Sequence, residues 1–403
     1  MASSSGYPRR GAVVVMAAGC GNTVGNVYIC QPLLPAMAVT FHATPGAAAL
    51  VATAAQIGYA IGILLVIPMA DRADPRKLIR ILLGLTCLML VCAGLSPSIN
   101  GLALLTLLVS TVTVIPQILI PIAVSSAADG QSGRVIGAMQ TGLVLGILLS
   151  RAVSGAIAQL SGTWRASYFF SAAMSAVLLL TLPMYLPERR PADAARDVSY
   201  RSLLASLPGL LIKWRDLQLS AVLGATVFGA FSAFWATLAF HLALPPFNLG
   251  SAQAGLFGLY GAAGAILAPV CGRLADKYGS TTVNTISIAM AAIAFAVFFV
   301  AGDASVLAIV IGVNLLDFGV QSGQIANQAR IFKLDGTARA RLNTVYMVFT
   351  FGGGALGSTL GSWAWTFAGW RGVCWAGLSL LAVGALFMLT RGLSRARVIE
   401  AHQ

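Results

Sequence analysis

The chain has 403 residues, of which 58% are hydrophobic and only 9% charged, and its mean hydropathy is +0.85. Such a composition cannot cover a water-facing surface, so it excludes a soluble protein and predicts one that is embedded in a lipid bilayer. The formal net charge of +13 would suggest a nucleic-acid partner in a soluble protein, but here the distribution of the charge among loops explains it.

Twelve apolar stretches, each long enough to cross a bilayer as a helix, follow one another along the chain. Short loops separate them, which leaves no room for a large catalytic domain. The predicted spans are 12–38, 47–70, 78–95, 100–126, 135–160, 167–186, 217–241, 251–274, 281–301, 304–327, 341–366 and 371–390.

The basic residues gather at alternate junctions between these spans. All Lys and Arg lie on one side except Arg165 and Arg371, which lie on the other, and Arg151, which lies within a span. Because basic loops stay in the cytoplasm, we expect both termini and the central loop to be cytoplasmic and the protein to reside in the inner (cytoplasmic) membrane.

The chain also repeats itself at a distance of 205 or 206 residues, which is typical of a duplicated membrane protein. We therefore predict an N-terminal six-helix half at 1–190, a cytoplasmic linker at 191–216 and a C-terminal six-helix half at 217–403. The matching positions are Asp71 and Asp276, Asp129 and Asp335, Gly146 and Gly352, Gly155 and Gly361, and Trp164 and Trp370.

A loop motif connects these features with a known family. The segment from Gly272 to Gly279, GRLADKYG, matches the pattern G-x-L-A-D-[RK]-x-G, and Asp71-Arg72 with trailing basic residues forms a counterpart in the first half. The sequence thus resembles the major facilitator superfamily. The resemblance implies an all-α membrane fold of twelve transmembrane helices in two pseudo-symmetric six-helix bundles. It also implies a cytoplasmic gate formed by Asp71, Arg72, Arg76, Gly272, Asp276, Lys277 and Gly279. The alternative is that these charges only set the topology.

Within the superfamily, the segments 26–35 and 56–62 look like those of twelve-span bacterial exporters of drugs, sugars and nucleosides. The fifth span departs from the antiporter pattern, because the Gly-Pro pair is missing and Ser150-Arg151 occupies that region. Thr106 stands near the place where many drug–proton antiporters carry an arginine.

In the superfamily, spans 1, 4, 7 and 10 line the central cavity, and in this sequence spans 1, 4 and 10 carry polar side chains at helical spacing. Lipid cannot satisfy such groups, so they must face protein or a wet cavity, and helix–helix hydrogen bonding is the alternative. We expect the substrate cavity to include Asn22, Asn26, Tyr28, Gln31, Ser110, Thr113, Gln117, Asn314, Gln321 and Gln324. Span 7 offers an apolar wall with Phe231 and Trp235, although aromatic residues also serve ordinary packing or face lipid.

Two charged residues lie within spans, where each costs about 2.5–3.5 kcal/mol at mid-bilayer and is a functional candidate. We hypothesise that Asp317 binds the coupling proton and that Arg151 is its partner or contacts an anionic group of the substrate. A permanent salt bridge that locks the two halves is the alternative.

An enzymatic function has no support in the sequence: the three histidines are far apart, and the nucleotide-binding pattern GxxxxGK[ST] is missing. We expect no cofactor and no metal. The leading hypothesis is a monomeric antiporter that exports a small hydrophobic or amphipathic metabolite or drug, coupled to protons, with lipid as its surroundings and no nucleic-acid partner. An uptake symporter or facilitator is the alternative, and a non-transporting membrane receptor on the same fold is a remote one.

Overall fold

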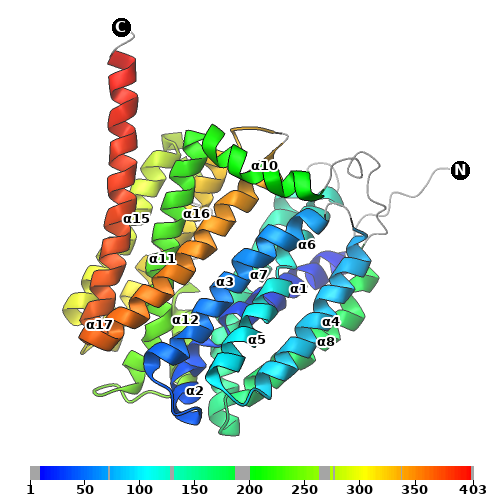
Figure 1. The fold of residues 1–403 in the computed structure, drawn as a ribbon, viewed down its shortest axis with the longest axis vertical. Helices are drawn as coiled ribbons and strands as arrows, with labels where there is room; N and C mark the ends of the chain where they lie inside the picture. Colours follow the sequence, from blue (N-terminus) through cyan, green and yellow to red (C-terminus); the bar gives the residue numbers. More distant parts are fainter. Residues whose placement is uncertain are drawn as a thin grey trace, which may run out of the picture.

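The computed structural model describes residues 10–70, 73–127, 131–186, 200–262, 273–275, 277–336 and 338–400. Within these ranges the regular structure is entirely helical, and the long helices run side by side in a bundle (Figure 1). Ten of the described helices are long and apolar enough to cross a membrane. The fold is therefore the all-α membrane architecture that the composition predicts.

The first half begins with a broken helix, as the prolines at 32 and 35 predict. A proline lacks the backbone N–H that a helix interior needs, so each one stands at the start of a new helical segment. A second break precedes Pro116. The helices are α1 (Arg10–Tyr28), η1 (Gln31–Leu33), α2 (Leu34–Thr40), α3 (Pro45–Ala70), α4 (Pro75–Gly94), α5 (Ile99–Val112), α6 (Pro116–Ser125), α7 (Ser132–Ser161) and α8 (Arg165–Tyr185).

The second half ends in a helix that contains the last two predicted spans. Its backbone leaves the helical region at Ala368 and at Gly369, whose φ of 56° favours glycine, so the chain turns there and a second leg returns along the bundle. The helices are α10 (Tyr200–Lys213), α11 (Arg215–Ala243), α12 (Ser251–Tyr260), α15 (Ser280–Ala301), α16 (Val306–Ile331) and α17 (Arg339–Glu400). The predicted span 251–274 begins with α12, and its residues 263–272 lie outside the described part of the chain.

Glycines bring corresponding helices of the two halves into close backbone contact. In the first half, a Cβ placed on Gly146 would meet the backbone of Gly21, so α7 lies directly on α1. In the second half, Gly357 meets Gly229 in the same way, where α17 lies on α11. Small residues allow such approaches between membrane helices.

At Gly146, the match between the two halves in the sequence differs by one residue from the match in the structure. The sequence pairs Gly146 with Gly352, but a Cβ on Gly352 would meet nothing within 4 Å. The neighbouring Gly353 makes the close approach instead, against Ala225. One residue turns a helix by about 100°, so the match at Gly352 falls on the wrong face.

The two halves pack against each other at one end of the bundle, the end that carries α2 (Figure 1). There α3 lies against α17, with Thr53 Oγ1 and Ser358 Oγ hydrogen-bonded at 2.8 Å. On the other side of the molecule α7 lies against α12, and Gln159 Oε1 accepts a hydrogen bond from the Ala252 N–H at 3.0 Å. We call these contacts the seal.

The opposite end, which carries both termini, is bridged by α10 (Figure 1). Tyr200 Oη donates to the carbonyl of Leu65 on α3 at 2.9 Å, and Arg341 Nη1 on α17 donates to Ser206 Oγ at 3.2 Å. The described part of the predicted linker is thus a helix that contacts both halves.

Candidate binding cavity

A cavity of about 1130 Å³ lies between the two halves. Residues at helix ends near α10 line its mouth, among them Ala70, Leu203 and Arg339, whereas Tyr28 and Arg151 line its deep end toward the seal. The cavity therefore opens toward the end with the termini and is closed at the other end.

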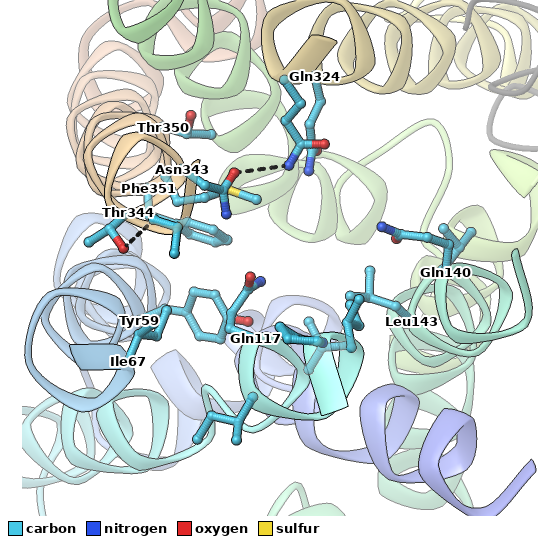
Figure 2. A pocket seen from close by; sticks show the side chains of 18 of the residues that line it. Tyr59, Ile67, Gln117, Gln140, Leu143, Gln324, Asn343, Thr344, Thr350 and Phe351 are labelled. Atoms are coloured by element: carbon cyan, nitrogen blue, oxygen red, sulfur yellow. Dashed lines mark hydrogen bonds between the residues drawn. The ribbon is translucent and has the colours of Figure 1, made fainter. Parts of the chain in front are cut away.

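Among the described residues, nine helices contribute to its wall: α1, α3, α6, α7, α11, α16 and α17 along its length, and α4 and α10 at its mouth through Pro75 and Leu203. The four spans predicted to line the cavity (1, 4, 7 and 10) contribute through α1, α6, α11 and α16. The helices α3, α7 and α17 contribute in addition. Figure 2 shows that labelled side chains from opposite helices, such as Tyr59, Gln140 and Gln324, point into the same space.

Six carboxamides belong to the polar part of the described wall. Gln117 projects from α6, Gln140 from α7, and Gln321 and Gln324 from α16 (Figure 2 labels all but Gln321). Near the mouth, Gln328 Nε2 donates to Asn343 Oδ1 at 3.3 Å. An amide both donates and accepts, so this wall can bind neutral polar groups of either kind.

Aromatic rings form the apolar part. Phe351 on α17 packs on Tyr59, with ring centroids 4.5 Å apart, and on Phe228 at 5.1 Å. Phe228 in turn stacks on Phe231 at 5.3 Å. The predicted wall residue Phe231 thus lines the cavity as one member of an aromatic cluster.

Seven residues predicted to line the cavity lie elsewhere. Two of them, Gln31 and Trp235, lie beside Arg151, and the other five are hydrogen-bonded or buried within the bundle. Asn22 Nδ2 contacts Ser175 Oγ on α8 at 3.5 Å, and Asn26 Nδ2 donates to Thr113 Oγ1 at 3.4 Å. Thr113 itself donates to the carbonyl of Thr23 at 2.7 Å. The other two are Asn314, which bonds its own helix at Val310, and Ser110, which is fully buried.

Arg151 lies at the deep end of the cavity with 1% of its surface exposed. Its Nε donates to Gln31 Oε1 at 2.7 Å, and its guanidinium carbon lies 3.8 Å from the ring centroid of Trp235 and 4.9 Å from that of Tyr28. Gln31 and Trp235 line a small void behind Arg151 and not the main cavity. Gln31, Trp235 and Tyr28 were all predicted to line the cavity, and of these three only Tyr28 does so.

Asp317 lies on α16 and lines the same cavity with 7% of its surface exposed. Its carboxylate packs against Gly261, where a Cβ would collide with it. Both Asp317 and Arg151 belong to the described residues, and no nitrogen of Arg151 comes within 4.0 Å of an oxygen of Asp317. The two charges therefore face one cavity without forming a salt bridge in this conformation.

Only three of the seven predicted gate residues, Arg76, Lys277 and Gly279, lie in the described part of the chain. Arg76 Nε donates to the carbonyl of Leu186 at 2.8 Å, so it ties the start of α4 to the end of α8. Lys277 is exposed beside the ring of Tyr278, and Gly279 precedes α15 with a φ of 85°. Asp71, Arg72, Gly272 and Asp276 lie outside the described residues.

Several cavity residues escaped the sequence analysis, although a signal for some of them exists. Gln140 precedes Arg151 by eleven residues, about three helical turns, so both lie on one face of α7. On α17, Asn343, Met347 and Thr350 are four and three residues apart, which also places them on one face of their helix. No group of three or more His, Cys, Asp or Glu that could hold a metal occurs among the described residues.

The comparisons with known proteins agree with this architecture. The model of the Major Facilitator Superfamily matches residues 15–336 and, in a second match, 247–400. The uncharacterized transporter YgaY of Escherichia coli O157:H7 is 37% identical over 375 residues, which cover 93% of this chain and 94% of YgaY. A Streptomyces coelicolor protein named as a probable transporter is 34% identical over 364 residues, 90% of this chain and 83% of its own.

Among solved structures, a variant of the nucleoside transporter NupG superposes with a TM-score of 0.76 over 94% of this chain and 98% of its own, at 15% identity. This similarity shows the fold and carries no information on the substrate. The family match and the two relatives decide the classification: the chain belongs to the Major Facilitator Superfamily, as a multi-pass membrane transporter and not an enzyme.

Proposed function

We propose that this transporter exports a small amphipathic metabolite or drug from the cell by alternating access, coupled to protons. One observation carries the proposal: a cavity between the two halves, open at one end and closed at the other, has a single carboxylate, Asp317, among its described lining residues. In this scheme the predicted halves, 1–190 and 217–403, rock against each other around the cavity.

The wall of the cavity supports an amphipathic solute. Aromatic rings such as Phe228 and Phe351 can bury an apolar body, and the amides of Gln117, Gln321 and Gln324 can orient its polar groups. Small-molecule sites in proteins commonly combine an apolar lining with a few placed polar groups.

The distribution of basic residues supports loading from the cytoplasm. Arg76, Arg134, Lys213, Lys333 and Arg339 all stand at helix ends on the side of the cavity mouth. By the positive-inside rule, this side and both termini are cytoplasmic in the inner membrane. The cavity would then take up its solute from inside the cell. In the proposed opening, the loop residues Asp71, Arg72, Arg76, Gly272, Asp276, Lys277 and Gly279 form the cytoplasmic gate.

Proton coupling is proposed to reside in Asp317. An ionised carboxylate within a membrane protein is costly unless it is paired, and no described residue places a cation within ion-pair distance of Asp317 in this conformation. Binding of a proton removes that cost. The occupancy of the carboxylate therefore changes the relative energies of the open and closed states, which is what coupling requires.

The proposal is tested by measuring flux of a compound panel into inside-out membrane vesicles, with and without an imposed proton gradient. We expect the gradient to change the accumulation of at least one amphipathic compound. The variant Asp317→Asn, which cannot exchange a proton, should abolish the effect of the gradient. If Asp317→Asn vesicles respond to the gradient like the wild type, Asp317 is not the coupling site. Accumulation only in right-side-out vesicles would contradict export.

A further inference from the structure

We propose that Arg151 binds the anionic group of the solute, so that the natural substrate is a small amphipathic organic acid in its carboxylate form. The inference rests on the proposed function and names its substrate class. It starts from a guanidinium that is buried, charged and only partly paired.

Aromatic rings and one amide hold this guanidinium in place. Trp235 and Tyr28 approach it through their ring faces, and Gln31 accepts the hydrogen bond from Nε. No described residue accepts a hydrogen bond from Nη1 or Nη2, and Nη2 is buried without a partner. A buried donor without a partner is energetically unfavourable, and more so when the group is charged. The remaining edge of Arg151 is thus preorganised for an acceptor that the protein itself does not supply.

A carboxylate fits this edge best. The two Nη groups of an arginine form a planar fork that matches both oxygens of a carboxylate, and such pairs are stronger than neutral hydrogen bonds. Arg151 lines the deep end of the cavity, with Phe231 beside it on α11 and Phe228 stacked on Phe231. A solute whose carboxylate reached Arg151 would therefore place its apolar body against the aromatic cluster.

The charges around the site then determine how the proton moves. The charged residues among the described lining are Arg151, Asp317 and, at the mouth, Arg339. The titratable groups that face the pair from other helices are Tyr28, Cys30 and Tyr59. When Asp317 is ionised, its carboxylate and that of the solute repel each other and compete for one guanidinium. When Asp317 is protonated, the carboxylate of the solute is the only anion among the described groups that line the cavity.

The anion and the proton are therefore expected to bind together and to cross together, in place of the exchange that the sequence predicts. The proton comes from water in the cavity, is held on a carboxylate oxygen of Asp317 and returns to water on the other side. No covalent bond of the solute changes. Export of such an acid would run down the gradient of the acid itself, and acidity outside the cell would slow it.

The test uses the full-length protein in lipid nanodiscs and isothermal titration calorimetry. The probes are monocarboxylates from short alkyl to two-ring aryl acids, each compared with its own amide and its own amine. We expect the tightest carboxylate to bind at least about tenfold more tightly than its amide, a difference of about 1.4 kcal/mol. The variant Arg151→Gln should abolish this preference. The control Arg371→Gln, which removes a cation whose side chain is 70% exposed and lies outside the cavity, should retain it.

The pH dependence supplies a second readout. Carboxylate affinity of the wild type should rise, by up to about tenfold per unit, as the pH falls through the range in which Asp317 takes up its proton. Asp317→Asn should bind carboxylates with no such dependence. A merely structural role of Arg151 would lower the stability of Arg151→Gln without changing the preference among the probes that still bind.

Four results would overturn the inference: amides or amines that bind as tightly as the acids, a carboxylate preference that survives in Arg151→Gln, affinity that falls on acidification, or no carboxylate binding at all. Proton-coupled flux of neutral or cationic compounds alone would also contradict the inference about Arg151, but it would leave the proposed transport function intact. Both proposals fail if no compound responds to the proton gradient.

Discussion

Among the polar side chains inside the bundle, two groups differ in what satisfies them. Asn26 bonds Thr113, and Asn284 Nδ2 donates to Asn327 Oδ1 at 3.1 Å, so these amides join helices to one another. Gln321 and Gln324 face the cavity and have no hydrogen bond to a described residue. The first group contributes to the stability of the bundle, and the second is available to a solute.

This division can be measured with a pair of substitutions. Asn26→Ala should destabilise the protein by about 0.6–1.7 kcal/mol, the range for interhelical hydrogen bonds in membranes, because Thr113 loses its donor. Gln324→Ala should leave stability unchanged and weaken solute binding, because it removes only a cavity amide. Thermal unfolding in detergent and transport KM provide the readouts. An unstable Gln324→Ala with unaltered KM would contradict the assignment.

At the scale of the helices, close packing depends on which face of a helix a glycine occupies. Gly353 and Gly357 are four residues apart on the face of α17 that meets α11, whereas Gly352 has open space at its Cβ position. Adjacent glycines on one helix thus have different roles: one permits contact with α11, and the other makes no such contact.

The adjacent pair provides a matched experiment. Gly353→Ala should destabilise the protein by about 1–3 kcal/mol, since the new methyl group would collide with the backbone of Ala225. Gly352→Ala should be neutral or stabilise it by up to about 1 kcal/mol, because alanine favours the helix and meets nothing. The comparison requires only the apparent unfolding temperatures of the two variants. If both lose stability equally, the packing of α17 on α11 is not as described.

The sequence predicted the elements better than the faces they present. Hydropathy located the spans, and the prolines at 32 and 35 located the break in the first one, because these signals are local. A stripe of polar residues shows that one face of a helix needs hydrogen-bond partners, but it does not show which neighbour supplies them. Asp317 and Gln324 line the cavity, whereas Asn314 on the same helix bonds its own backbone. The contributions of α3, α7 and α17 depend on how the halves meet, which no local pattern encodes.

For the whole molecule, the two ends of the bundle differ in how the halves are joined. At the closed end the seal consists of direct contacts, with Thr53 on Ser358 and Gln159 on the start of α12. At the open end α10 bridges the halves through Tyr200 and Ser206 and leaves the cavity mouth between them. Alternating access requires the seal to separate while the open end closes.

The central claim, that one cavity serves both sides of the membrane in turn, is tested most directly by locking the seal. The side chains of Thr53 and Ser358 are in hydrogen-bond contact, so cysteines at these two positions should be near enough to form a disulfide. Oxidation of the double variant Thr53→Cys/Ser358→Cys should abolish flux, a reductant should restore it, and solute binding from the open end should persist. Each single cysteine variant under the same oxidant is the control. Undiminished flux through a fully cross-linked protein would contradict the account.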